Sequence, residues 1–173
     1  MFDFKDIHTH NPDAFDAVIN YDPVVDSFIM HPDKFYSVGI HPWHTSLVTD
    51  NDLVTLSSLA QSSNVVAIGE AGIDMLKGGD INSQISLFEY HVQLSESLYK
   101  PLIIHCVKAV DDIIRLRKKL SPLQIWIYHG FRGKPQLARQ LIQHGFYLSF
   151  GKIYNNDSLS VAIDNNRAFY ESD

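Results

Sequence analysis

The sequence predicts an α/β fold, specifically a (β/α)8 barrel of the TIM type that is shorter than usual. Short runs rich in β-branched and aromatic residues alternate along the chain with segments of helical periodicity. Polar residues able to bind metals fall at the carboxyl ends of these runs, which form the active face of a parallel barrel. The same alternation also allows a second architecture, an open α/β sheet.

Eight segments have the composition of strands. Three of them, at 64–74, 101–106 and 123–130, have nearly continuous apolar cores, which is typical of strands covered on both faces. The eight predicted strands are residues 2–10, 17–22, 34–42, 64–74, 101–106, 123–130, 145–151 and 168–173.

Helical patterns lie between the later strands. In the first of them Leu53, Leu56 and Leu59 fall on one face, while Pro135 suits a first helical turn and Gly145 a helix end. His91 and His144 lie within helical segments, and we expect them at the surface or as capping groups. The predicted helices are residues 51–61, 83–99, 109–120, 135–144 and 157–167.

The chain has 173 residues, whereas such barrels typically have about 250. Residues 11–16 are too few for a crossover helix between the first two strands, and no helix follows the last one. We therefore expect a single domain over 1–173 with a trimmed first crossover and no closing C-terminal helix. Its end at Asp173 suggests a C-terminal truncation, and the uncovered strand would favour a homodimer.

Composition excludes several classes of protein. The formal net charge of −6 argues against a general nucleic-acid-binding surface, although a local site around a bound cation remains compatible with it. The single cysteine, Cys106, excludes an internal disulfide and fits a reducing compartment. No apolar run is long enough to cross a membrane, and the N-terminus does not resemble a signal peptide, so we expect a cytoplasmic protein.

Two histidines in "DIHTH" (6–10) are the first sign of a metal site. His8 and His10 are two residues apart, so in a strand both imidazoles point to one side. Imidazole nitrogens and carboxylate oxygens are the usual ligands of zinc-like ions. The other polar residues near strand ends are His41, His44, Glu70, Asp74, His105, His129, Glu171 and Asp173.

The four histidines at positions 8, 10, 105 and 129, together with Glu70 and Asp173, supply enough ligands for two ions. Two ions roughly 3.5–4 Å apart would activate a water and polarise a phosphoryl or carbonyl oxygen. Taken singly, each of these residues also has an ordinary explanation, because a lone histidine at a strand end is more often a partly buried polar group.

Several neighbouring residues have structural interpretations as well. His41 or His44 could cap the helical region that follows, Asp74 could order its loop, and Glu171 could support the ligand two residues on. The basic run at 115–119 is most simply a solvated helix face. Cys106 follows His105 directly, so its side chain should point to the opposite face of the strand and pack there.

Six motifs occur in an order that resembles TatD-like metal-dependent hydrolases, and the resemblance runs from residue 6 to residue 173. These proteins are (β/α)8 barrels of the amidohydrolase-like group, usually described as metal-dependent deoxyribonucleases. The motifs are "DIHTH", "GIHPWH", "AIGEAGID", "PLIIHC", "HGFRG" and the terminal "ESD".

The resemblance implies a role for each matched residue. One metal would be bound by His8, His10, Glu70 and Asp173, and a second by His105 and His129 with Glu70 bridging both. The implied catalytic residues are Glu70, Asp173, which would accept the proton of the attacking water, and His41, which would contact the scissile phosphate or assist its leaving group. The implied substrate contacts are His41, Lys108 and Arg132.

The resemblance favours a phosphodiesterase or deoxyribonuclease that uses water activated by two divalent ions, Zn, Mn or Mg, on single-stranded DNA. The acidic charge favours the same chemistry on a small phosphoester, lactone or amide. A third hypothesis is a truncated, inactive member of the family.

Overall fold

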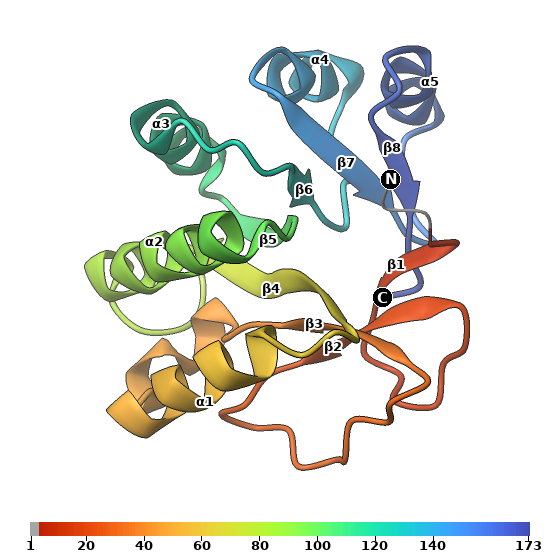
Figure 1. Ribbon diagram of the computed structural model, residues 1–173. Helices are drawn as coiled ribbons and strands as arrows, with labels where there is room; N and C mark the ends of the chain where they lie inside the picture. Colours follow the sequence, from red (N-terminus) through yellow and green to blue (C-terminus); the bar gives the residue numbers. More distant parts are fainter. Residues whose placement is uncertain (1–3) are drawn as a thin grey trace.

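The protein is described from a computed structural model over residues 4–173, in which eight parallel strands follow one another in sequence order (Figure 1). They form a nearly closed barrel, which confirms the predicted fold over an open sheet. Most strands are shorter than predicted. Their bounds are β1 Asp6–Thr9, β2 Ala17–Tyr21, β3 Phe35–Val38, β4 Val65–Asp74, β5 Leu102–Val107, β6 Trp126–Tyr128, β7 Phe146–Phe150 and β8 Ala168–Tyr170.

All five predicted α-helices are present, with bounds that differ by up to three residues. Asp80 caps the longest of them by accepting hydrogen bonds from the amides of Asn82 and Ser83. No helix within residues 4–173 is long and apolar enough to cross a bilayer. The helices are the 3-10 helix η1 Pro42–Leu47 and α1 Asp50–Ala60, α2 Ile81–Leu98, α3 Val110–Leu120, α4 Pro135–Gln143 and α5 Asn156–Asp164.

The helices cover only part of the barrel. In Figure 1 they form an arc outside β3 to β8, whereas the connections at 10–16 and 22–34 contain no helix. The trimmed first crossover is therefore confirmed. The outer side of β1 and β2 is flanked by irregular chain instead.

The chain after β8 returns to β1. The amide of Ser172 donates to the carbonyl of His8 over 3.3 Å and to the carboxylate of Asp6 over 3.1 Å. The hydroxyl of Ser172 donates to the other oxygen of Asp6. These bonds, which we call the Asp6–Ser172 clasp, bring Asp173 beside the first strand.

The barrel interior has a small apolar cluster that orients the polar residues above it. Ile103 of β5 and Ile127 of β6 pack together there. His105 follows Ile103 by two residues, and His129 follows Ile127 by two residues. Residues two apart on a strand share a side, so both imidazoles point into the barrel. A Cβ at Gly72 of β4 would meet the carbonyl oxygen of His105 at 1.8 Å, so glycine permits this close approach of the two strands.

His91 is a buried structural residue, which makes the prediction of a surface or capping position wrong. Its Nδ1 donates to the carbonyl of Leu87 over 2.7 Å, and its Nε2 accepts the amide of Ile40 over 2.9 Å. Its position on an inward face of α2, against the chain leaving β3, depends on tertiary packing and has no local sequence signal. His144 is the residue that ends α4, as predicted.

The protonation state of His91 makes stability depend on pH. Burial lowers its pKa to about 4 from 6.5, and a charged ring would set an N–H against the amide of Ile40. The unfolded chain therefore binds more protons between these two values, so the free energy of unfolding falls as the pH drops through that window. Between about pH 7.5 and about pH 5 we expect a loss of roughly 2 kcal/mol from this residue.

Urea unfolding of the wild type and of His91→Gln at both pH values measures this contribution. The variant should lose less stability on acidification, because glutamine does not titrate. Equal losses in the two proteins would contradict the assignment.

Candidate metal centre

Glu70 lies at the centre of the predicted ligands, and its two carboxylate oxygens face different histidines. Oε2 lies 3.2 Å from Nε2 of His8 and 3.4 Å from Nε2 of His10. Oε1 lies 2.6 Å from both Nδ1 of His105 and Nε2 of His129. One oxygen of Glu70 therefore faces the histidines at the end of β1, and the other faces the histidines at the ends of β5 and β6.

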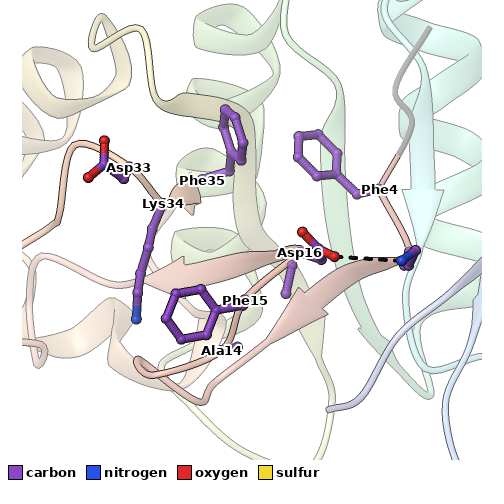
Figure 2. Close-up of a pocket in the computed structure, with 9 residues that line it drawn as sticks. Phe4, Ala14, Phe15, Asp16, Asp33, Lys34 and Phe35 are labelled. Atoms are coloured by element: carbon purple, nitrogen blue, oxygen red, sulfur yellow. Dashed lines mark ion pairs between the residues drawn. The ribbon is translucent and has the colours of Figure 1, made fainter.

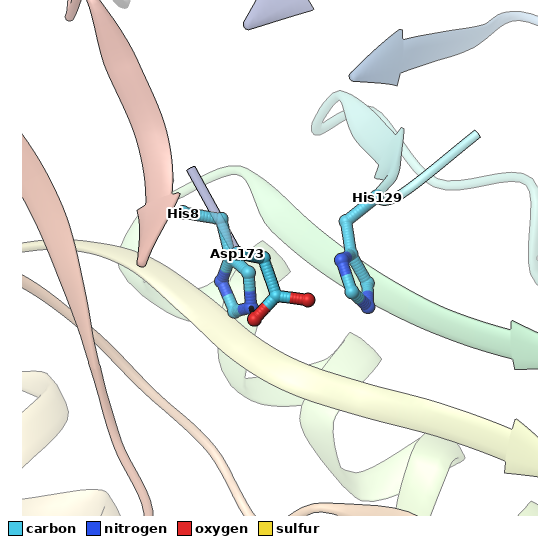
Figure 3. A group of neighbouring side chains, drawn as sticks. All are labelled: His8, His129 and Asp173. Atoms are coloured by element: carbon cyan, nitrogen blue, oxygen red, sulfur yellow. Dashed lines mark ion pairs between the residues drawn. The ribbon is translucent and has the colours of Figure 1, made fainter. Parts of the chain in front are cut away.

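Asp173 completes the side of the cluster nearest β1. Its Oδ1 lies 3.4 Å from Nε2 of His10 and 3.9 Å from Nε2 of His8. Figure 3 shows His8, His129 and Asp173 turned toward one another although they come from three separate segments. The structure thus brings together all six residues predicted as metal ligands.

Asn20 fixes the backbone beneath this cluster, and sequence analysis missed it. Its buried side-chain oxygen accepts the amide of Glu70 over 2.8 Å and the hydroxyl of Ser37 over 3.4 Å. The strand register shifts between Ile68 and Ala71, next to the point that Asn20 supports. A signal was present, because Asn20 is a polar residue near the carboxyl end of the apolar β2.

The ionisable groups of the cluster shift one another's pKa values. Burial alone would raise the pKa of Glu70, but His129 and hydrogen bonds from His10 and His105 hold it well below its usual range. Burial likewise opposes the charge on His129, yet Glu70 and Glu171 outweigh it and raise the pKa of His129 well above its ordinary value. A hydrogen bond to Glu70 also raises the pKa of His10. These neighbours thus stabilise Glu70 as a carboxylate.

His41 is turned toward the same carboxylate. It also caps η1, which agrees with the predicted role of capping the helical region that follows. Its Nδ1 accepts the amide of Trp43 over 3.2 Å. Its Nε2 lies 3.3 Å from Oε1 of Glu70 and 3.1 Å from Nδ1 of His105. Burial lowers the pKa of His41, which favours the neutral ring.

Two further carboxylates support the imidazoles. Oδ2 of Asp74 lies 3.2 Å from Nε2 of His105 and accepts the indole N–H of Trp43 over 2.6 Å. Asp74 also accepts loop amides, in agreement with its predicted ordering role. Oε1 of Glu171 lies 3.6 Å from Nδ1 of His129, beyond hydrogen-bond distance, and the hydroxyl of Ser149 holds its other oxygen.

The state of His8 tests whether these residues fit a metal ion. His8 is fully buried, and neither ring nitrogen has a hydrogen bond, although Nε2 is close to Glu70. A buried imidazole normally satisfies its nitrogens, so a bound cation would complete this one. Ligand atoms within 4.8 Å of one another occur in three overlapping groups: His8, His129 and Asp173; His8, His10 and Glu70; and His41, Glu70 and His105.

The cluster opens into a cavity of about 350 Å³ whose lining includes five of the six predicted ligands. The exception is the fully buried His8. Lys108 and Arg132 are exposed after β5 and β6 and do not line this cavity, so their phosphate contacts stay a prediction. Asp22 and His44 do line it.

A second cavity of about 350 Å³ lies at the amino ends of β1 to β3 and holds none of the predicted ligands (Figure 2). Phe15 is largely exposed there, and Lys5 pairs with Asp16 over 3.6 Å. The polar cluster is therefore confined to the carboxyl ends of the strands, where barrel enzymes place their active sites.

Known proteins are similar to this chain in sequence. A curated relative from Buchnera aphidicola, described as an uncharacterized metal-dependent hydrolase, is 37% identical over 68% of this chain and 44% of its own length. The 3'-5' ssDNA/RNA exonuclease TatD of Erwinia tasmaniensis is 35% identical over 65% of this chain and 45% of its own. The chain thus spans less than half the length of these relatives.

A solved structure agrees with the fold, and a family model matches most of the chain. The TatD-family hydrolase from Entamoeba histolytica superimposes with a TM-score of 0.69 at 26% identity, covering 80% of this chain and 50% of that one. The sequence model of the TatD related DNase family matches residues 24–173. The chain therefore belongs to the TatD related DNase family.

Proposed function

We propose that this chain is a metal-dependent hydrolase that cleaves phosphodiesters with two divalent ions. The single observation that carries the proposal is the carboxylate of Glu70, which has histidines from β1 on one oxygen and histidines from β5 and β6 on the other. His8, His10, Glu70 and Asp173 would hold one ion, and Glu70, His105 and His129 the other. Bound ions would lower the pKa of a water and polarise the phosphoryl oxygen.

The protein's own residues would orient the reaction. Asn20 fixes the backbone of Glu70, and Asp74 fixes the ring of His105. Asp173 is partly exposed at the cavity and would accept the proton of the attacking water. His41 would donate from Nε2 toward the phosphate, since its other nitrogen is held by the amide of Trp43.

Single-stranded DNA is the first substrate to test, because one relative is named as an ssDNA/RNA exonuclease. The net charge of −6 and the absence of Lys108 and Arg132 from the cavity lining favour a second candidate, a small phosphodiester. Rates on a labelled oligonucleotide and on bis(4-nitrophenyl) phosphate separate these two substrates.

The Glu70→Gln substitution should abolish most of the hydrolysis. It keeps the shape of the side chain but removes the charge that would bridge two cations, so we expect a loss of at least about 100-fold in kcat. The assay uses protein loaded with Mg, Mn or Zn. Glu89→Gln is the matched control, because that carboxylate pairs with Lys119 on α3, away from the cavity. Unchanged cleavage by Glu70→Gln would refute the proposal.

Metal binding should stabilise the fold. An ion present at about 100 times its dissociation constant adds about 2.7 kcal/mol, which corresponds to a rise of about 5–10 °C in Tm for a chain of this size. Differential scanning calorimetry with and without a chelator measures the shift. Glu70→Ala should show little of it, and an equal shift in this variant would place the stabilising ion elsewhere.

The Asp6–Ser172 clasp should control metal affinity without touching the ions. Removing the Asp6 carboxylate frees the segment that carries Asp173, so we expect Asp6→Ala to weaken metal binding by about 10-fold. Isothermal titration calorimetry measures the affinity, with Asp13→Ala as an exposed-carboxylate control. Wild-type affinity in Asp6→Ala would mean that the clasp is not needed to place Asp173.

A further inference from the structure

His44 lines the catalytic cavity but has no part in the proposed metal-binding set. It belongs to η1, and its side chain is about one quarter exposed. Its Nδ1 lies 2.7 Å from Oδ2 of Asp22, a carboxylate that is almost completely buried. Within residues 4–173 no hydrogen-bond partner reaches its Nε2. One ring nitrogen is therefore held by the protein, and the other is available in the cavity.

Asp22 is itself fixed in place. Its Oδ2 also accepts the amide of His41 over 2.9 Å, and its Oδ1 accepts the amide of Val24 over 2.9 Å. Its own amide donates to Asp26 over 2.7 Å. Because Asp22 is an acceptor only, the nitrogen of His44 that faces it carries a proton. Any proton that His44 exchanges with a substrate is therefore carried by Nε2.

The neighbouring His41 is differently engaged. Its Nε2 points at Glu70 and His105, and its Nδ1 accepts a backbone amide. Asp22 contacts His44 directly, and the ring centre of His41 is 5.8 Å from that of His44. Asp26, in the connection after β2, lines the same cavity. Of the two histidines in "GIHPWH", only His44 has a ring nitrogen without a hydrogen-bond partner among residues 4–173.

We propose that His44, oriented by Asp22, is the general acid that protonates the leaving group. This inference rests on the proposed function. Water oxygen bonds to phosphorus as the bond from phosphorus to the leaving oxygen breaks, and that oxygen takes the electron pair and the proton from Nε2. The water's proton passes to Asp173 and then to solvent, and His44 regains a proton from solvent. The net reaction adds water across one ester bond.

Two substrates that differ in their need for a proton test this role. Bis(4-nitrophenyl) phosphate releases a stable nitrophenolate, whereas a thymidine dinucleotide releases an alkoxide that must be protonated. For His44→Gln we expect kcat on the dinucleotide to fall by about 100-fold or more, with KM nearly unchanged. The rate on the nitrophenyl ester should stay within about threefold of wild type. His31→Gln, in the connection at 22–34, is the matched control.

Asp22 should act through His44 as a positioning residue. Asp22→Asn should therefore slow the dinucleotide selectively in the wild-type background and add little in the His44→Gln background. Thermal unfolding and metal titration of each variant report whether the fold and the metal centre survive. A selective loss that occurs only when His44 is present supports the pair.

The possible failures are distinguishable. If His44→Gln slows both esters equally, or slows neither, the acid role is wrong while the proposed function stands. If the wild type hydrolyses neither ester with any of the three metals, the proposed function fails and this inference fails with it.

Discussion

The ionised carboxylate of Glu70, buried inside a barrel, is the feature on which the rest of the site depends. Removing such a charge from water costs several kcal/mol unless paired groups replace the lost hydration. Here five imidazoles, those of His8, His10, His41, His105 and His129, lie within 3.4 Å of its two oxygens. The parallel barrel makes this convergence possible because strands far apart in sequence end on the same face. The arrangement that stabilises the carboxylate also brings together the residues that we propose as cation ligands.

The segment after β8 meets β1 beside this site. The Asp6–Ser172 clasp lies where the barrel lacks the support of helices, since the connections at 10–16 and 22–34 are irregular. At this junction a few hydrogen bonds hold neighbouring segments of the barrel together, whereas elsewhere the strands are also covered by helices. This couples closure of the barrel to the position of Asp173, and under the proposed function it would also couple folding to metal affinity.

The sequence predicted those parts of the structure that follow from local pattern. The strand alternation predicted the fold class. The i, i+2 spacing predicted that His8 and His10 point to one side, and both rings do face the same oxygen of Glu70. His105 and His129 could be predicted because they are polar residues near the carboxyl ends of predicted strands. Such residues occupy the one face on which the topology makes all strands converge.

Tertiary partners explain what the sequence did not predict. His91 sits on a helix, and only the packing of α2 against Ile40 shows that it is buried. The contact between Asp22 and His44 joins two segments separated by 22 positions, so no local spacing encodes it. Asn20 could have been found by the same strand-end rule as the ligands, but nothing local shows that it supports the backbone of Glu70.

Under the proposed function, Glu70 would be held in common by two metal ions. Anomalous diffraction from crystals soaked in Mn or Zn tests it most directly. The account predicts two peaks roughly 3.5–4 Å apart, one near the imidazoles of β1 and one near those of β5 and β6. Both peaks should disappear or weaken in Glu70→Ala crystals. A single peak, or two peaks that lie away from Glu70, would contradict the account.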